Sequence, residues 1–568
     1  MADFGIEQLR RQIDELTAEL EATKKYGLVW DRESVQEKMV LKCKNNIPLL
    51  MPVPSNDVLA GSLNNVLIEG DNYHALLCLN MVAKEAIDVI YIDPPYNTGK
   101  KDLNYNDHFV NADDPFYHSS WLELMSKRLK LARDLLKDSG CIFISIDDRE
   151  QAQCKLLCDS IFGRQNFLCQ FVRVTSGGKQ DSSTFAVTHE YVICYAKRLS
   201  SFRANKIAKQ DDPKKYPYVD SNGKKYKTQL LRKWGDNDRR EDRPNLFYPL
   251  FYSFNTGKIS TQRFEANDLK TFYPKRPNGS DGRWRWQIET MQANIDSGLV
   301  ECRIIKKNVE MYEKIYFDPD ELSFSPFDSV IKDSWQSGTD DLKAIFGDKT
   351  FEYAKPVEFI KHLLSMAGDK NSLIMDFFAG SGTTGQAVLE MNRTDNGSRR
   401  FILCTNNENN ICTDVLLPRV RTVITGIRSD GKEYSKGIPA NLHYFKTDFI
   451  RDEANSEQAK YNLVEKVDSL LCVAEDIFDE KERNGYSSHF ADGDRHLFIF
   501  NDFYNEERFT EFKQRVLATD GTKIVYVYSS DNTVDETLFS DPSITLKPIP
   551  SKIYEIYREI VEEIKRGE

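Results

Sequence analysis

The chain has 568 residues, of which 40% are hydrophobic and 29% charged, and a formal net charge of −11. This length suits three or four globular domains, and no apolar run approaches the ~20 residues that span a membrane. The N-terminal residues do not form a signal peptide, and the 11 scattered cysteines argue against zinc sites and disulfides. We expect a cytoplasmic protein without a metal site.

Residues 1–45 are predicted to be mainly helical. Between Phe4 and Lys24, apolar residues recur every three or four positions, with charged residues between them. The apolar stripe consists of Ile6, Leu9, Ile13, Leu16 and Leu20. It is too short for an independent coiled coil, so we expect it to pack on the same protein or on a second subunit.

A strand, a helix and a second strand are predicted between residues 65 and 92. The first strand ends in Gly70-Asp71-Asn72, where Asp71 is well placed to cap the helix that follows. Residues 87–92 are apolar and rich in β-branched side chains, which is typical of a short buried strand.

The turn after this second strand, Asp93-Pro94-Pro95-Tyr96, is the centre of the predicted active site. The prolines lack N–H groups and have fixed φ angles, so the chain leaves the sheet in a rigid, extended turn. The turn lies at the carboxyl end of a strand, where open α/β sheets bind ligands. Asp93 and the Pro94 carbonyl can each accept one N–H of an exocyclic amino group while Tyr96 stacks on its ring. The nitrogen lone pair is then available as a nucleophile, without a metal or a covalent intermediate. An ordinary turn with a helix-capping aspartate is the alternative.

Strands alternate with helices up to residue 198. We expect a loop at 100–119, helices at 121–136 and 150–162, and strands at 140–148 and 188–197. This alternation predicts a parallel, doubly wound sheet. His189 and Glu190 suggest acid/base chemistry, but a pocket-wall residue or a hydrogen-bonded loop histidine is the preferred interpretation.

Residues 199–328 have a different composition. Between residues 197 and 289 there are 22 Lys and Arg against 11 Asp and Glu, so this basic segment lies within an acidic protein. Such a segment suits a phosphate backbone, and interleaved aromatic residues suit base stacking. The aromatic residues are Tyr216, Tyr218, Tyr226, Trp234, Phe247, Tyr248, Phe251, Tyr252, Trp284 and Trp286. We predict an inserted nucleic-acid-binding domain, mostly irregular and β; a solvated charged insertion is the alternative.

A glycine-rich loop follows the strand predicted at 373–378. Gly380-x-Gly382-x-x-Gly385 satisfies the dinucleotide fingerprint, so a nicotinamide or flavin site competes. Asp376 before the loop can address a cationic group, and Thr383 opens the next helix with a hydroxyl; both favour S-adenosylmethionine. The next strand, 401–405, leads to Glu408, a candidate for holding ribose hydroxyls.

These motifs resemble a known family. Asp93 to Gly99 is similar to the catalytic motif of amino-group DNA methyltransferases, and Asp376 to Thr384 to their cofactor loop. The catalytic strand comes first, which is a circular permutation of the usual methyltransferase order. Over residues 25 to about 445, the chain resembles the β-class N6-adenine enzymes typified by the modification subunit of type III restriction systems. The permuted order argues against protein-glutamine methyltransferases, which share a similar Pro-Pro-Tyr but carry the glycine loop first.

The resemblance implies a doubly wound, Rossmann-like α/β sheet in circularly permuted order. Its expected parts are an N-terminal helical segment (1–45), a catalytic half (46–198), a target-recognition insertion (199–328), a cofactor-binding half (329–446) and a C-terminal α/β assembly domain (447–568). In the last part, strands are expected at 496–500 and 523–528.

The resemblance also implies the site residues. The catalytic set is Asp93, Pro94, Pro95 and Tyr96. The set for S-adenosylmethionine is Asp71, Asn72, Lys355, Pro356, Asp376, Phe377, Phe378, Ala379, Gly380, Ser381, Gly382, Thr383, Thr384 and Glu408.

The implied reaction is methylation of adenine N6 in a specific duplex sequence, with the target base flipped out. Cytosine N4 is the closest competing target, because the same acceptors fit its amine. A different possibility is a DNA-recognition and assembly subunit of a restriction complex with a nuclease–translocase partner; a solitary regulatory methyltransferase is equally compatible. Enzymes of this class commonly work as dimers, so a homodimer is expected.

Overall fold

The computed structural model describes residue 30 and residues 37–43, 46–97, 117–175, 185–305, 308–332, 335–347, 354–451, 466–502, 505–528 and 534–549. The chain forms two compact units, one from Met1–Asn205 and Asp328–Glu568 and one from Lys206–Phe327. The helix expected between Phe4 and Lys24 and most of the loop expected at 100–119 lie outside the described residues.

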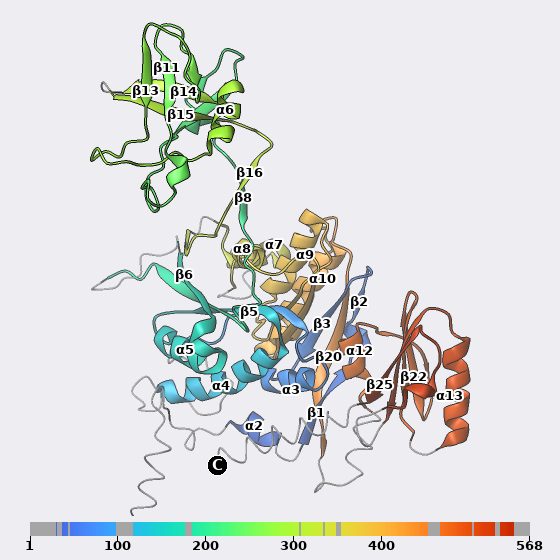
Figure 1. Ribbon diagram of the computed structural model, residues 1–568. Coiled ribbons are helices and arrows are strands. Elements are labelled where there is room, and N and C mark those ends of the chain that lie inside the picture. Colours follow the sequence, from blue (N-terminus) through green and yellow to red (C-terminus); the bar gives the residue numbers. More distant parts are fainter. Residues whose placement is uncertain are drawn as a thin grey trace, which may run out of the picture. The chain divides into compact units, whose positions relative to one another are not determined.

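An eleven-stranded sheet organises the first unit (Figure 1). In spatial order its strands are β1 (Asn46–Pro52), β20 (Asn441–Arg451), β3 (Asn64–Glu69), β19 (Arg400–Thr405), β18 (Leu373–Asp376), β4 (Ile87–Ile92), β5 (Leu136–Ile146), β7 (His189–Ala196), β6 (Phe167–Val174) and β17 (Val330–Lys332), and β2 (Val58–Leu59) pairs with β20. All neighbours from β20 to β5 are parallel. The predicted α/β sheet is confirmed, and its central strands are parallel. The strand predicted at 188–197 is β7, which pairs antiparallel with both β5 and β6.

The permuted order brings the two motif-bearing strands together. β4 and β18 are distant in sequence, yet they pair directly, with Val89 opposite Ile374 and Ile90 opposite Met375. Parallel neighbours end at the same edge of a sheet, so the turn that begins at Asp93 and the loop after Asp376 lie next to each other. β7, the antiparallel neighbour of β5, begins at this edge.

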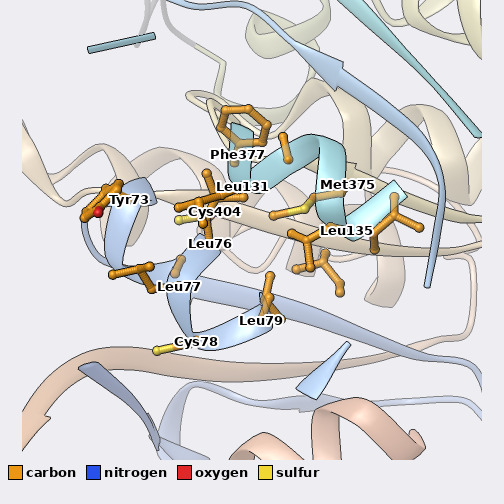
Figure 2. Packing of buried hydrophobic residues seen from close by; sticks show 14 of the residues in the cluster. Tyr73, Leu76, Leu77, Cys78, Leu79, Leu131, Leu135, Met375, Phe377 and Cys404 are labelled. Atoms are coloured by element: carbon orange, nitrogen blue, oxygen red, sulfur yellow. The ribbon is translucent and has the colours of Figure 1, made fainter. Parts of the chain in front are cut away.

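Helices cover both faces of the sheet. On one face, α3 (Asn72–Val82) and α4 (Tyr117–Leu135) pack over alternate residues of β18 and β19, including Met375 and Cys404 (Figure 2). Residues of opposite parity, such as Leu403, face α9 (Thr383–Asp395). There a Cβ on Gly385 would lie 3.0 Å from Leu403 Cδ1, so glycine permits the close approach. With α9 lie α7 (Gly338–Phe346), α8 (Val357–Ser365) and α10 (Leu417–Thr425).

Short helices complete this unit. They are α2 (Lys38–Lys42), α5 (Gln151–Cys158), η1 (Pro54–Asn56), η2 (Asp159–Gly163), η3 (Arg164–Asn166), η6 (Glu408–Asn410) and η7 (Ile411–Leu416). In the part of the chain that the structure describes, no helix is both long and apolar enough to cross a membrane.

The second unit, Lys206–Phe327, lies within the interval 199–328 predicted as an insertion. Its strands form three small sheets: β14 (Val300–Ile305), β15 (Asn308–Tyr316), β10 (Lys225–Leu230) and β9 (Tyr218–Val219); β12 (Ile259–Ser260), β11 (Leu250–Ser253) and β13 (Leu269–Phe272); and β16 (Leu322–Ser325) with β8 (Ile207–Gln210). The helices are α6 (Ile288–Asp296), η4 (Pro213–Lys215) and η5 (Pro244–Leu246). β8 and β16, the first and last strands of the unit, pair antiparallel. We refer to this pair of strands as the neck of the unit.

The C-terminal residues form a separate five-stranded sheet. Its strands are β21 (Asp479–Arg483), β22 (Ser487–Asp492), β23 (Arg495–Phe500), β24 (Thr522–Tyr528) and β25 (Ile544–Ile549). Its helices are α12 (Asp468–Glu475), α13 (Glu506–Ala518) and η8 (Glu536–Leu538), and α12 packs against α3 and β1. The expected strands at 496–500 and 523–528 are present. The boundary expected at 446/447 falls inside β20, because that strand continues along β1 to Arg451.

Candidate active site

The turn after β4 is fixed on both sides by neighbouring side chains. Trp121 Nε1 donates a hydrogen bond of 2.7 Å to the Pro95 carbonyl. Asn97 has a positive φ of 56°, and its Nδ2 donates to the Tyr117 carbonyl at 3.2 Å and to Glu150 Oε1 at 2.6 Å. The turn therefore has one well-defined shape.

Two acceptors of this turn have no hydrogen-bond donor among the described residues, and in this sense we call them open. Oδ1 of Asp93 accepts a hydrogen bond of 2.9 Å from the Tyr96 hydroxyl and lies 3.1 Å from Lys355 Nζ. Among the described residues, none donates a hydrogen bond to Oδ2 of Asp93 or to the Pro94 carbonyl. The Pro95 carbonyl, in contrast, is occupied by Trp121. The two open acceptors are the two that the sequence predicts for an amino group.

The Tyr96 ring is held through its hydroxyl. This hydroxyl accepts a hydrogen bond of 2.6 Å from Lys355 Nζ, donates to Asp93, and lies 3.4 Å from Glu190 Oε2. A ring fixed in this way offers a constant stacking surface.

Glu190 and Arg173 join the site from the β6–β7 pair. They lie directly opposite each other in the ladder and form an ion pair, and Lys355 Nζ is 3.3 Å from Glu190 Oε2. Burial opposes ionisation of Glu190, but Lys355 and Arg173 outweigh it and hold its pKa below the usual value. Burial raises the pKa of Asp93, an effect that Lys355 partly offsets.

The sequence did not single out Arg173 and assigned Glu190 only as a possible wall residue. Glu190 is instead part of the charged network around Asp93. His189 is hydrogen-bonded as expected, since its Nε2 lies 2.8 Å from the Tyr191 hydroxyl. Lys355 contacts the catalytic turn, and Pro356 is the N-cap of α8; their contacts with the cofactor stay predictions.

Asp376 shapes the glycine loop from within. Its Oδ1 accepts from the Phe378 N–H at 3.0 Å and its Oδ2 from the Thr384 hydroxyl at 2.5 Å. Burial raises the pKa of Asp376 to about 7, although these two hydrogen bonds oppose the change. Oδ1 therefore binds the beginning of the loop and Oδ2 the start of α9, whereas the sequence predicted that this carboxylate contacts a cationic group of the cofactor.

The loop backbone leaves open space at Gly380. Gly380 and Gly382 have φ values of +47° and +80°, which glycine adopts at little cost. Among the described residues, a Cβ on Gly380 would meet only the Phe378 carbonyl oxygen, at 3.8 Å, whereas one on Gly382 would lie 2.9 Å from Leu416 Cγ. The loop can thus receive a ligand at Gly380, while Gly382 packs on η7.

A buried arginine supports this loop from behind. Arg419 of α10 donates to the hydroxyls of Ser381 (3.1 Å) and Thr383 (2.8 Å) and to Gln386 Oε1 (2.8 Å). Burial lowers its pKa to about 10. No sequence motif indicated this role. Ala379, Phe378 and Phe377 are buried as well, and Phe377 belongs to the core in Figure 2.

Asp71 and Asn72 act as structural links. Asp71 caps α3 by accepting from the Tyr73 N–H at 2.8 Å, as expected. Asn72 Nδ2 donates to the Phe377 carbonyl at 2.9 Å, and its Oδ1 accepts from the fully buried Arg128. Glu408 is exposed beyond β19 in η6. The open backbone at Gly380 and this exposed carboxylate suit a nucleoside cofactor with ribose hydroxyls.

Comparisons with known proteins agree with this geometry. A family model described as DNA methylase matches residues 87–416, more than half of the chain. The chain belongs to this family of N6/N4 DNA methyltransferases. This DNA methyltransferase uses S-adenosylmethionine as its cofactor.

Individual relatives include enzymes of restriction–modification systems. The methyltransferase is 35% identical to the type II methyltransferase M.KpnI of Klebsiella pneumoniae, over 61% of this chain and 81% of that protein. It is 34% identical to the Mod subunit of the type III enzyme EcoPI of Escherichia phage P1, over 61% of this chain and 58% of that subunit. It thus spans under two thirds of the Mod subunit's length.

A solved structure of the PvuII DNA methyltransferase, described as cytosine-N4-specific, matches 66% of this chain and 92% of its own. The sequence identity is 9% and the TM-score 0.33, so this likeness supports no statement about the target base.

The ten aromatic residues predicted to stack on bases differ in exposure: four are buried, four are partly buried and two, Tyr218 and Trp234, are exposed. Tyr216, Tyr226, Tyr248 and Trp284 are buried in Lys206–Phe327, two of them in its core, and this corrects their predicted availability for stacking. Trp234 is 68% exposed and follows two cationic residues. Burial could not be read from the aromatic spacing, because the strands that create it pair over long distances.

Proposed function

We propose that this DNA methyltransferase methylates adenine N6 within a specific duplex sequence. The observation that carries the proposal is the pair of open acceptors, Asp93 Oδ2 and the Pro94 carbonyl, beside the fixed ring of Tyr96. S-adenosylmethionine supplies a methyl group that is activated by the sulfonium charge.

The two acceptors orient the amine. Each accepts one N–H of the exocyclic amino group, so the nitrogen lone pair points out of the ring plane toward the methyl group. The amine gains positive charge during transfer, and the ionised Asp93 then attracts it more strongly than before. Positioning of this kind accounts for most of the expected acceleration.

The target base leaves the duplex to reach this turn. Flipping costs a few kcal/mol of lost pairing and stacking. Stacking on an aromatic ring returns about 1–3 kcal/mol, and Tyr96 needs no reorganisation because its hydroxyl is already held.

The cofactor is proposed to lie against the glycine loop. Gly380 leaves space beside its backbone, and Glu408 offers a carboxylate to the ribose hydroxyls. Asp376 and Asn72 contribute by holding the loop through Thr384 and the Phe377 carbonyl.

Nucleoside analysis tests the base directly. DNA incubated with the protein and S-adenosylmethionine is digested, and its nucleosides are separated by mass spectrometry. We expect N6-methyladenine, and its loss with Asp93→Ala at unchanged cofactor affinity. N4-methylcytosine as the product would contradict the choice of base, and the absence of both products would contradict the function.

DNA recognition is proposed for Lys206–Phe327, the unit that contains most of the basic segment. Its cations would release counterions from phosphates, so binding should weaken steeply with salt. Exchange of the unit for that of a relative should change the methylated sequence and not the chemistry. An unchanged recognition sequence would show that specificity lies elsewhere. A DNA substrate also favours a cytoplasmic location.

A second role is assembly in a restriction complex, which the similarity to the EcoPI Mod subunit favours. We propose a homodimer in which one copy holds DNA while the other methylates, with a nuclease–translocase subunit as a further partner. The apolar stripe that begins at Ile6 is a candidate contact. Mixing Asp93→Ala subunits with subunits whose insertion is disabled should restore activity. A fully active monomer in light scattering would contradict this arrangement.

A further inference from the structure

Four charged side chains from four segments meet behind the catalytic turn. Asp93 follows β4, Arg173 comes from β6, Glu190 from β7, and Lys355 precedes α8. They form a chain of contacts from Arg173 to Glu190, to Lys355 and to Asp93. We refer to these four residues as the charge cluster. Two anions and two cations balance each other, which lowers the cost of burying them together.

Arg173 fixes the position of the Glu190 side chain independently of the turn that begins at Asp93. Arg173 faces Glu190 across the β6–β7 ladder, donates to its Oε1, and has its guanidinium 4.2 Å from the centre of the Phe359 ring of α8. Arg173 is only 6% exposed. The Glu190 carboxylate therefore has one position, with Oε2 directed at Lys355.

Lys355 is shared between two carboxylates. Its Nζ lies 3.1 Å from Asp93 Oδ1 and 3.3 Å from Glu190 Oε2, and it donates to the Tyr96 hydroxyl at 2.6 Å. The contact with Asp93 is made through Oδ1. Oδ2 of Asp93 is left for the substrate.

We propose that Glu190 and Arg173 are positioning residues for methyl transfer: they hold the Lys355 ammonium on Asp93 Oδ1 and on the Tyr96 hydroxyl, so that Asp93 stays ionised with Oδ2 facing the amino group. This inference rests on the proposed function and deepens it. It gives Lys355 a role at the reacting amine, which is separate from the cofactor contact predicted from the sequence.

Ionisation of Asp93 is the quantity that the charge cluster controls. Burial raises the pKa of Asp93, Lys355 lowers it, and Glu190 raises it. The Tyr96 hydroxyl stabilises the ionised form by donating a hydrogen bond, and Asp376 of β18 and Tyr91 of β4 lie within electrostatic range. A protonated Asp93 carries no charge to attract the amine. Activity must therefore fall at low pH, with a midpoint set by this balance of charges.

The test measures single-turnover methylation against pH for three variants. Lys355→Met removes the cation on Asp93, and Arg173→Met lets Glu190 draw Lys355 away. Both should move the acidic limb of the profile to higher pH, by about one pH unit or more for Lys355→Met, since an opposite charge at this distance moves a carboxyl pKa by about 1–3. Glu190→Gln removes an anion that raises the pKa of Asp93, so the limb should move to lower pH. The rate on the plateau should nevertheless fall, because the Lys355 ammonium loses the carboxylate that positions it.

Lys361→Gln is the matched control, because Lys361 of α8 also lies between two carboxylates, and these, Glu358 and Glu390, are not part of the charge cluster. Its profile should coincide with that of the wild type. Arg173→Lys keeps the charge and should return the limb toward its original position.

Binding of S-adenosylmethionine, measured by calorimetry on the same proteins, separates the alternatives. The inference is supported if all three variants bind the cofactor with near-normal affinity while the acidic limb moves to higher pH in Lys355→Met and Arg173→Met and to lower pH in Glu190→Gln. Acidic limbs with unchanged midpoints, or midpoints that all move in one direction, would overturn the inference. So would a Lys355→Met variant that loses cofactor affinity while the midpoint of its acidic limb stays the same. Failure of the proposed function gives a different result, namely a wild type that forms no methylated amino group at any pH.

Discussion

The Asp93→Asn variant should lose far more methylation activity than the small change in the side chain suggests. Oδ1 of Asp93 faces two donors, the Tyr96 hydroxyl and the Lys355 ammonium. The asparagine of the Asp93→Asn variant would satisfy them by turning its carbonyl inward, since an amide nitrogen cannot accept from the ammonium. Its NH2 group would then face the amino group of the substrate, donor against donor.

The contacts set the size of this effect. A hydrogen bond to a charged group contributes about 1.5–3 kcal/mol, and here it is replaced by a repulsive contact. A total of about 3–4 kcal/mol corresponds to a roughly 10²–10³-fold loss of rate. The loss should appear in kcat, because the attraction grows as the amine becomes cationic.

Rapid-quench single-turnover assays with radiolabelled S-adenosylmethionine measure this loss. Cofactor affinity should change little, because Asp93 is proposed to contact the base and not the sulfonium. Asp93→Asn combined with Lys355→Met provides an internal check. Without the ammonium, the amide can turn its NH2 toward the Tyr96 oxygen and its carbonyl toward the substrate.

The double variant should therefore be about tenfold faster than Asp93→Asn alone, a coupling expected only between residues in contact. A single variant that keeps more than a tenth of the wild-type rate, or a double variant slower than the single one, would refute the assigned orientation of this carboxylate.

Three other changes test separate parts of the molecule. Gly380→Val should weaken S-adenosylmethionine binding at least tenfold in calorimetry, whereas Gly431→Val, with a similar positive φ and equally open surroundings, should not. Asp376 has a pKa of about 7 when folded against 3.8 as the ordinary value, so the stability it contributes is complete below about pH 4 and lost as the pH rises through 7; melting temperatures of Asp376→Asn should fall less between these values than those of the wild type. Trp234→Ala should weaken duplex binding several-fold in fluorescence anisotropy without lowering the melting temperature, because Trp234 is 68% exposed; a normal affinity would exclude a DNA contact.

The features that sequence predicted best are those encoded within a short stretch. The strand before Asp93 is short, apolar and ended by two prolines, and the structure has β4 at Ile87–Ile92. The loop after Asp376 is marked by closely spaced glycines, and α9 begins at Thr383. Both signals need only neighbours in the chain.

The features that sequence missed depend on residues brought together by folding. Arg173 and Glu190 become partners only through the pairing of β6 with β7, and no strand was predicted at Phe167–Val174. Arg419 looks like an ordinary surface cation of an amphipathic helix, yet it is fully buried behind Ser381. The bonds of Asp376 to its own loop likewise depend on a conformation that composition does not reveal.

The neck formed by β8 and β16 has a consequence for how this family can vary. The chain leaves the catalytic half before β8 and returns after β16, and these two strands hold its ends together by their own ladder. The entropy cost of bringing β4 and β18 together therefore depends mainly on the pairing of β8 with β16, and little on the chain between these two strands. Even for a flexible segment, doubling the length between such ends costs only about 0.6 kcal/mol. Everything beyond the neck can lengthen, shorten or be exchanged at little thermodynamic cost to the sheet edge where Asp93 and Asp376 lie. The unit proposed to recognise DNA can therefore change while the chemistry is kept.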